Sequence, residues 1–148
     1  MRIVLQRVGS ASVSVADDVI GKIQKGYVLF LGVCASDTKT QADRLADKIA
    51  KLRIFPDEND KINLSIADVG GGILVISQFT LYADCRKGNR PSFTDAAGPG
   101  QANELYEYFL KACEGRFQKV AHGSFGAHMN VELVNDGPFT LVLEDAAI

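Results

Sequence analysis

Residues 27–33, YVLFLGV, form an uninterrupted apolar run that decides the fold class of this chain. A short run without alternating polar residues is typical of a strand that is covered on both faces. Residues 39–55 follow it, and their apolar side chains recur every three or four positions, as a buried helical stripe requires: Ala42, Leu45, Ile49 and Leu52. This succession of strand and helix predicts a sheet with helices packed against it.

The segments on either side extend the same pattern. Residues 2–8 and 11–15 alternate apolar and polar side chains as strands do, and residues 17–26 are expected to form a turn, a short strand and another turn. Further strands are expected at 73–83, 117–126, 127–135 and 139–145. A second amphipathic helix is expected at 102–115, with three inward residues: Leu105, Phe109 and Ala112. We therefore expect one α/β domain over residues 1–148, in which layered mixed β-sheets pack against two main amphipathic helices.

The composition excludes several classes of protein. Hydrophobic residues make up 47% and charged residues 23%, as in a globular protein, and no run reaches the ~20 apolar residues of a membrane span. The first residues alternate in polarity and do not resemble a signal peptide, so we expect a cytoplasmic protein with no membrane partner. The net charge of −2 argues against a general nucleic-acid coat but leaves room for a local basic patch.

Neither a metal site nor a cofactor is expected. The three cysteines are widely spaced and match no disulfide framework or zinc pattern. The two histidines, His122 and His128, are separated by a segment without Cys, Asp or Glu. The glycines at 70–72 precede a strand and no Gly-Lys-Ser/Thr follows them, so we interpret them as a flexible turn rather than a phosphate loop.

The strand expected at 73–83 becomes polar in its second half. If it stays regular, Ile76, Gln78, Thr80 and Tyr82 share one face. These polar side chains have two interpretations. They hydrogen-bond to nearby backbone groups at the strand end, which is the interpretation that the residue types alone favour, or they mark a site with Ser77 or Thr80 as nucleophile. No Ser-His-Asp ordering and no Gly-x-Ser-x-Gly elbow is present, so a triad hydrolase is only weakly supported.

Residues 132–145, ELVNDGPFTLVLED, raise a separate question. Two alternating apolar runs flank residues 135–138, and Asp136-Gly137 is suited to a two-residue hairpin turn. Pro138 follows, however, and proline brings no backbone donor to a strand ladder. The pattern therefore predicts a hairpin and leaves the Gly-Pro pair unexplained.

At this point two motifs carry a family resemblance. Residues 77–81, SQFTL, resemble the SQxxL motif of the D-aminoacyl-tRNA deacylases, and residues 135–140, NDGPFT, resemble their NxGPxT motif. Four further segments match the family in the same order, so the resemblance covers essentially the whole chain: VLQRV with ASVSV, LRIF, KGNRPSF and SFGAHM. Phe139 departs from the pattern, because the family commonly has valine there.

The resemblance implies an editing esterase with an α/β/β fold of the deacylase type. In this family the Gly-Pro peptide bond is cis and reaches from one subunit of a homodimer into the active site of the other. Carbonyl oxygens of Gly137 and Pro138 then bind the substrate ammonium group, and the proline ring excludes L side chains. D-aminoacyl esters at the tRNA 3′ end pass this filter, and so does glycine mischarged onto alanine tRNA.

The resemblance and the residue types together suggest roles for individual residues. Main-chain N–H groups of Gln78, Phe79 and Thr80, next to Ser77, are expected to stabilise the developing oxyanion, with the substrate's own 2′-hydroxyl as a helper. Thr80 could also hold a water or the carbonyl. The pocket wall is expected to comprise Phe125, Gly126, Ala127 and Met129. Arg7 is expected to fix the Gly-Pro motif, and three basic residues to contact tRNA phosphates: Arg86, Lys87 and Arg90.

Simpler interpretations stay open at this stage. Met129 suits ordinary core packing equally well, Arg7 suits a surface ion pair, and the basic cluster suits a solvated loop. For the whole protein, the alternative is a non-catalytic module that binds aminoacyl-tRNA or another RNA terminus.

Overall fold

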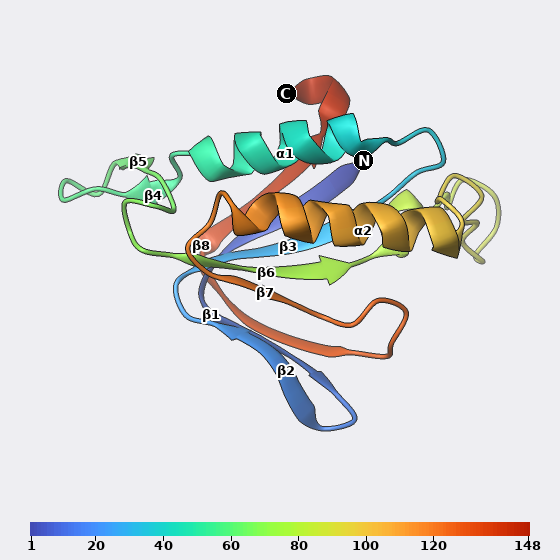
Figure 1. Ribbon diagram of the computed structural model, residues 1–148, viewed down its shortest axis with the longest axis horizontal. Coiled ribbons are helices and arrows are strands. Elements are labelled where there is room, and N and C mark those ends of the chain that lie inside the picture. Colours follow the sequence, from blue (N-terminus) through green and yellow to red (C-terminus); the bar gives the residue numbers. More distant parts are fainter.

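The computed structural model describes residues 1–148 and is built around one six-stranded sheet (Figure 1). Its strands are β1 (Arg2–Val15), β2 (Asp18–Ile23), β3 (Gly26–Gly32), β6 (Gly72–Ser77), β7 (Val120–His122) and β8 (Asn130–Glu144). The order is β2-β1-β3-β6-β7, with β8 on the other side of β1. β1 is antiparallel to β2, β3 and β8, whereas β3, β6 and β7 are parallel. The expected mixed α/β architecture is confirmed.

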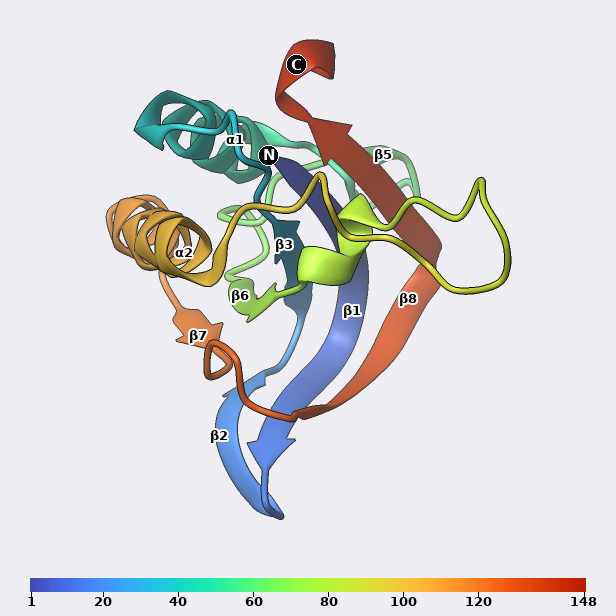
Figure 2. The same cartoon turned by 90° about the vertical axis from the view of Figure 1, so that its right-hand side faces the viewer.

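Two helices, α1 (Lys39–Lys51) and α2 (Pro99–Glu114), lie side by side and cover one face of this sheet (Figures 1 and 2). Ala42, Leu45 and Ile49 are buried as expected, but Leu52 is only half-buried because α1 has already ended at Lys51. α2 begins earlier than expected, since Pro99 opens it and a proline at a first helical position loses no hydrogen bond. Its inward face includes Cys113 rather than the half-buried Ala112. None of the helices has the length and apolar character needed to cross a membrane.

The buried side chains form two clusters on opposite faces of the sheet. The larger one lies between the sheet and the helices, and the smaller one lies beneath β1, β2, β3 and β6. β3 contributes to both, with Tyr27, Leu29 and Leu31 in the larger cluster and Val28 in the smaller one. The prediction that residues 27–33 form a strand covered on both faces is therefore confirmed.

β1 is one strand of 14 residues and not the two strands that the sequence suggested. Its first half pairs with β3, its second half pairs with β2, and β8 runs along its whole length. β1 therefore spans from the helix-covered part of the sheet to the β1–β2 hairpin, which projects away from the helices (Figure 2). A small separate ribbon that the sequence analysis missed is formed by β4 (Phe55–Pro56) and β5 (Ile62–Leu64).

The hairpin expected at residues 135–138 is wrong. β8 continues through this segment as a single strand, with Asn135 opposite Val8 and Thr140 opposite Gln6, so the intervening residues bulge out of the ladder. The Gly137–Pro138 peptide bond in this bulge is cis. β8 has no second neighbour, and proline's missing N–H therefore interrupts no further pairing.

The strand expected at residues 73–83 also ends early. β6 stops at Ser77, and residues Phe79–Tyr82 form a 3₁₀ helix, η1, so Gln78, Thr80 and Tyr82 do not share a strand face. β3 ends at Gly32, and η1 packs closely against this glycine. A Cβ on Gly32 would lie 3.1 Å from the Leu81 Cβ. At the other end of β6, of the glycines expected to form a turn only Gly70 lies in one, and Gly72 already opens the strand. A Cβ on Gly26 would lie only 1.8 Å from the Gly72 carbonyl oxygen.

Candidate active site

A cavity of about 550 Å³ lies where the parallel strands β3 and β6 end. Ligands of α/β proteins commonly bind at this end of parallel strands. Three groups of residues line the cavity: Leu31, Val33, Ile76, Ser77, Gln78 and Phe79 from the strands and η1; Ala97, Pro99 and Ala102 from the start of α2; and Phe125, Gly126, Ala127, His128, Met129 and Val131 from the segment between β7 and β8. Ten of these residues are hydrophobic, so the few polar groups are conspicuous.

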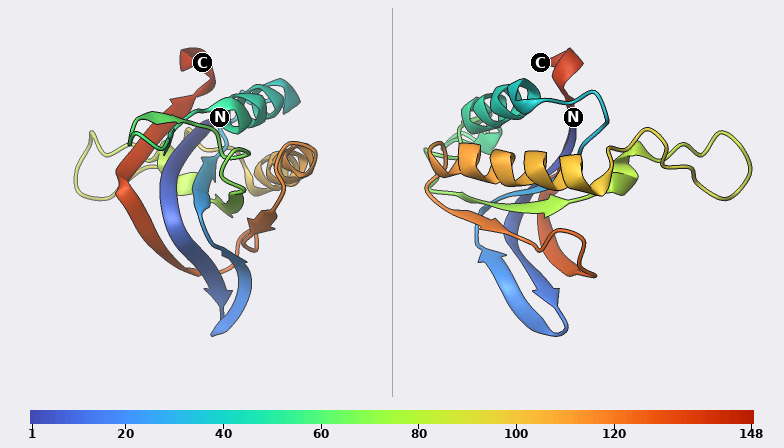
Figure 3. Two further views of the ribbon diagram at one scale, coloured as in Figure 1. Left: turned by 90° about the vertical axis from the view of Figure 1, so that its left-hand side faces the viewer. Right: turned by 45° about the vertical axis from the view of Figure 1, so that its right-hand side comes forward.

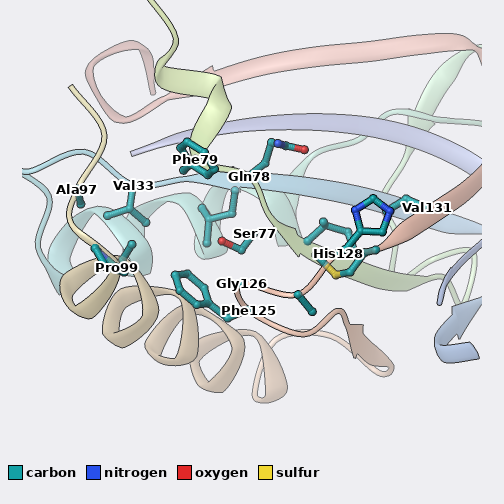
Figure 4. Close-up of a pocket in the computed structure, with 15 residues that line it drawn as sticks. Val33, Ser77, Gln78, Phe79, Ala97, Pro99, Phe125, Gly126, His128 and Val131 are labelled. Atoms are coloured by element: carbon teal, nitrogen blue, oxygen red, sulfur yellow. The ribbon is translucent and has the colours of Figure 1, made fainter. Parts of the chain in front are cut away.

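The junction between β6 and η1 supplies the polar wall. Figure 4 shows Ser77, Gln78 and Phe79 on one side of the cavity, with Phe125 and Gly126 on the other side and His128 at the far end beside Val131. The Gln78 N–H donates to the Leu31 carbonyl oxygen over 2.8 Å and so extends the β3 ladder. Phe79 and Thr80 open η1, and the first N–H groups of a helix have no partner inside it.

Thr80 lies differently from the other residues of its motif. Its side chain is exposed and does not line the cavity. Its hydroxyl oxygen accepts a hydrogen bond from the side-chain amide nitrogen of Gln78, Nε2, at 2.5 Å. The structure therefore gives the Thr80 hydroxyl an orienting contact with Gln78, while the Thr80 main chain stays at the start of η1.

The four residues predicted for the pocket wall all line the cavity, and their loop is held by short contacts. The Gly123 N–H donates to the Val75 carbonyl oxygen over 3.0 Å, which ties the loop to β6. A Cβ on Gly123 would lie 2.5 Å from the Met129 sulfur, so a larger residue there would displace the Met129 side chain from its present place in the cavity wall. Met129 contacts the smaller core cluster and also lines the cavity, so both interpretations of this residue hold.

The Phe125 ring is fixed from the helix side. It packs against the Tyr106 ring with centroids 5.9 Å apart, and the buried Tyr106 hydroxyl donates to the Val75 carbonyl oxygen over 3.1 Å. Burial raises the pKa of Tyr106, which keeps this hydroxyl protonated as a donor. α2, β6 and the loop after β7 are thereby joined at the cavity floor.

Sequence reasoning missed several lining residues. His128 lies between two predicted wall residues, and its place in SFGAHM was the signal that could have found it. Val33 and Ala97 are brought together by a hydrogen bond from the Ala97 N–H to the Val33 carbonyl oxygen at 2.9 Å. This contact joins segments that are far apart in the chain, so no local sequence pattern predicts it.

The basic loop projects from the body of the protein next to η1 (Figure 3). Asp84 and Ser92 exchange two backbone hydrogen bonds, of 2.7 and 2.9 Å, at its base. Arg86 binds both carboxylate oxygens of Asp84 at 2.8 and 2.7 Å, which raises the pKa of Arg86 and lowers the pKa of Asp84. Lys87 and Arg90 are exposed and form no ion pair, so they carry the loop's uncompensated positive charge.

Two aromatic rings lie between this loop and the cavity. Phe79 and Phe93 meet edge to face with centroids 5.1 Å apart, although 54% and 37% of their surfaces remain exposed. Exposed aromatic faces of this kind suit stacking with a planar ligand group.

The Gly137–Pro138 segment does not reach the cavity of its own chain. Neither residue lines it, and both are exposed on β8. Arg7 contacts the segment, because its Nε donates to the Asp136 carbonyl oxygen at 2.9 Å and its Nη1 donates to the Ile54 carbonyl oxygen at 2.6 Å. Arg7 is only 8% exposed, so a simple surface ion pair does not describe it. The structure thus groups the predicted residues into a cavity, a basic loop and a separate Gly-Pro bulge.

Known proteins resemble this chain in sequence and in fold. The chain is 53% identical, over 99% of its length and 98% of the relative, to a D-aminoacyl-tRNA deacylase of Clostridioides difficile. A solved structure titled c-Myc DNA Unwinding Element Binding Protein superposes with a TM-score of 0.92 at 39% identity, covering 97% of this chain and 98% of that one. A probable eukaryotic D-amino acid tRNA deacylase shares the fold, with a TM-score of 0.81 at 18% identity over 96% of this chain and 97% of that one. The family model described as D-Tyr-tRNA(Tyr) deacylase matches residues 4–144, and the chain therefore belongs to the D-Tyr-tRNA(Tyr) deacylase family.

Proposed function

We propose that the protein hydrolyses the ester bond of D-aminoacyl-tRNAs and of glycyl-tRNA(Ala), and rejects L-aminoacyl-tRNAs. The observation that carries this proposal is the cavity at the end of β6, which brings the SQFTL and SFGAHM segments face to face. The names of the family and of its relatives point to the same substrate class.

Hydrolysis rests on main-chain groups. The N–H groups of Phe79 and Thr80 at the start of η1 donate to the oxyanion that forms when water attacks the ester carbonyl. The Gln78 N–H takes no part, because it is already bonded to the Leu31 carbonyl oxygen of β3, and the Gln78 side chain holds the Thr80 hydroxyl instead. The ribose 2′-hydroxyl of the substrate assists. Ser77 lines the cavity beside this junction, but it has no hydrogen bond to His122 or His128 that would activate it as a nucleophile.

Selection against L-amino acids comes from a second copy of the chain. Gly137 and Pro138 stand exposed on an edge strand, and Val134 and Val142 of the same strand are each 63% exposed. Exposed apolar side chains on an unpaired edge favour association with another chain. In the homodimer the carbonyl oxygens of Gly137 and Pro138 enter the partner's cavity and accept hydrogen bonds from the substrate ammonium. The Pro138 ring then occupies the space that an L side chain needs, whereas D side chains and glycine avoid it.

The tRNA end is held beside the cavity. Lys87 and Arg90 neutralise phosphates of the acceptor strand, and the exposed faces of Phe79 and Phe93 stack against a base near the 3′ end. Arg86 contributes less charge, because Asp84 already binds its guanidinium. This local patch is compatible with the overall charge of −2.

The test is hydrolysis by the purified protein of three substrates: D-tyrosyl-tRNA, L-tyrosyl-tRNA and glycyl-tRNA(Ala). Free amino acid is expected from the first and the third, and none above background from the second. An Ala127→Phe variant, which fills the cavity wall, serves as the control for a contaminating esterase and is expected to lose both activities. Binding of D-tyrosyl-tRNA without release of tyrosine would support the non-catalytic module instead.

A further inference from the structure

Arg7 holds an unusual position beneath the Gly137–Pro138 bulge. Its charged side chain is buried, and the nearest carboxylate oxygen, on Asp136, is 3.5 Å away on a half-exposed side chain. Two main-chain carbonyls bind the edges of the guanidinium, those of Ile54 and Asp136. A buried charge needs such compensation on every side, because desolvation is costly. The flat face of the guanidinium is the side that these hydrogen bonds leave open.

Phe139 covers that open face. The Arg7 Cζ lies 4.8 Å from the centroid of the Phe139 ring, which is a cation–π geometry. The ring is half-buried and also packs against the larger core cluster. Phe139 therefore bridges the core and the guanidinium.

The backbone of Phe139 is tied to the other end of the bulge. Its N–H donates to the Asn135 side-chain oxygen at 2.7 Å. The side-chain nitrogen of Asn135 donates to the Phe139 carbonyl oxygen at 3.3 Å and to the Thr140 hydroxyl at 3.2 Å. These hydrogen bonds close residues 135–140 into a small loop. Since Pro138 directly precedes Phe139, any rotation of the Phe139 backbone moves the proline with it.

We propose that Phe139 is a positioning residue for chiral selection: its ring, stacked on Arg7, sets the direction in which Gly137 and Pro138 project from β8. The inference rests on the proposed function, because the projecting segment matters only if it selects the substrate. Arg7 alone fixes the Asp136 end of the bulge through a hydrogen bond to a carbonyl. The aromatic face fixes the other end, one residue past Pro138. A residue without an aromatic ring at this position would leave the guanidinium face uncovered, and only the Asn135 hydrogen bonds to the Phe139 main chain would still hold that end.

The test compares Phe139→Leu, which keeps apolar bulk but removes the aromatic face, with Phe139→Tyr, which keeps the face. We expect the ratio of kcat/KM for D-tyrosyl-tRNA over L-tyrosyl-tRNA to fall about three- to tenfold in Phe139→Leu and to stay within about twofold of wild type in Phe139→Tyr. Thermal unfolding of both variants is followed in parallel. An unchanged ratio in Phe139→Leu, or an equal fall in both variants, overturns the proposal.

A spectroscopic measurement separates this proposal from the proposed function. A proton above an aromatic ring is shifted upfield, so the Arg7 Nε–H resonance of the wild type and of Phe139→Tyr should lie upfield of that of Phe139→Leu. Absence of that difference shows that the ring does not face the guanidinium, and the proposal fails whatever the enzyme does. If the shift is present but the wild-type protein releases no amino acid from D-tyrosyl-tRNA, the proposed function fails, and the positioning role fails with it.

Discussion

The cavity at the end of β6 and the Gly137–Pro138 bulge on β8 hold their functional groups in opposite ways. The cavity is framed by parallel strands whose side chains are buried on both faces, so packing fixes its walls. The bulge lies on an exposed edge strand and is fixed by a few polar bonds and one cation–π contact. We therefore expect substitutions in the buried strands that frame the cavity to destabilise the whole protein, and substitutions in the bulge mainly to change its selectivity.

The largest effect is expected for Gly26→Ala, at the base of the buried strand pair. The new Cβ would lie 1.8 Å from the Gly72 carbonyl oxygen, and both strands have to separate to admit it. We expect a loss of about 3 kcal/mol or more in the free energy of unfolding, measured by denaturant titration. The matched control is Gly9→Ala on the exposed side of β1, where a Cβ meets nothing within 4 Å. Equal stability of the two variants would contradict the rigid-cavity account.

The next effect is expected for Gly137→Ala on the exposed edge. Its Cβ would lie 2.4 Å from the Phe139 backbone nitrogen, so the bulge must shift, but few buried contacts depend on its position. We expect a smaller loss of stability, about 1 to 2 kcal/mol, and a loss of D-tyrosyl-tRNA hydrolysis and of the preference for D over L substrate. A variant as unstable as Gly26→Ala, or one with unchanged chiral preference, would remove the distinction between the two regions.

A smaller effect is expected in the basic loop beside the cavity. Lys87→Gln and Arg90→Gln should each weaken tRNA binding and lower the slope of log affinity against log salt by about 0.7 to 0.9. Arg86→Gln should lower that slope less, because Asp84 already neutralises the Arg86 guanidinium. Binding titrations at several salt concentrations measure all three. Equal slopes for the three variants would show that the Arg86–Asp84 pair opens when tRNA binds.

The smallest effect is expected far from both regions, at the tip of the β1–β2 hairpin. Ala16 and Asp17 have positive φ angles of 47° and 69°, which non-glycine residues adopt at a cost. The pair Ala16→Asn with Asp17→Gly suits this turn and should stabilise the protein by about 0.5 to 1 kcal/mol without changing hydrolysis. Thermal unfolding and the D-tyrosyl-tRNA assay check it. A change in activity would mean that the hairpin communicates with the site.

The buried part of the fold could be predicted from the sequence because local patterns encode it. The apolar run at 27–33 and the stripes of the two helices reflect burial on fixed faces, and both are confirmed except at Leu52 and Ala112, which are half-buried. The end of β6 could not be predicted, because Phe79–Tyr82 have residue types that favour strands. Their turn into η1 follows from packing against Gly32, which is distant in the chain.

The site was only partly predictable for the same reason. Residues within recognised motifs, such as Ser77 and Phe125, do line the cavity, whereas Val33 and Ala97 reach it through a non-local hydrogen bond. Asp136-Gly137 suggested a hairpin because that pair suits tight turns. The pairing of β8 with β1 instead joins opposite ends of the chain, and no local rule predicts it.

The central claim is that each cavity is completed by the Gly137–Pro138 segment of another copy, and a mixed dimer tests it most directly. One chain carries Ala127→Phe and the other Gly137→Ala; the two are co-expressed with different tags, and the heterodimer is isolated. One cavity in this heterodimer retains both a native wall and a native segment from the partner, so about half of the wild-type D-tyrosyl-tRNA hydrolysis should return, although each parent dimer has little. A heterodimer as inactive as its parents would show that the segment does not serve the partner's cavity.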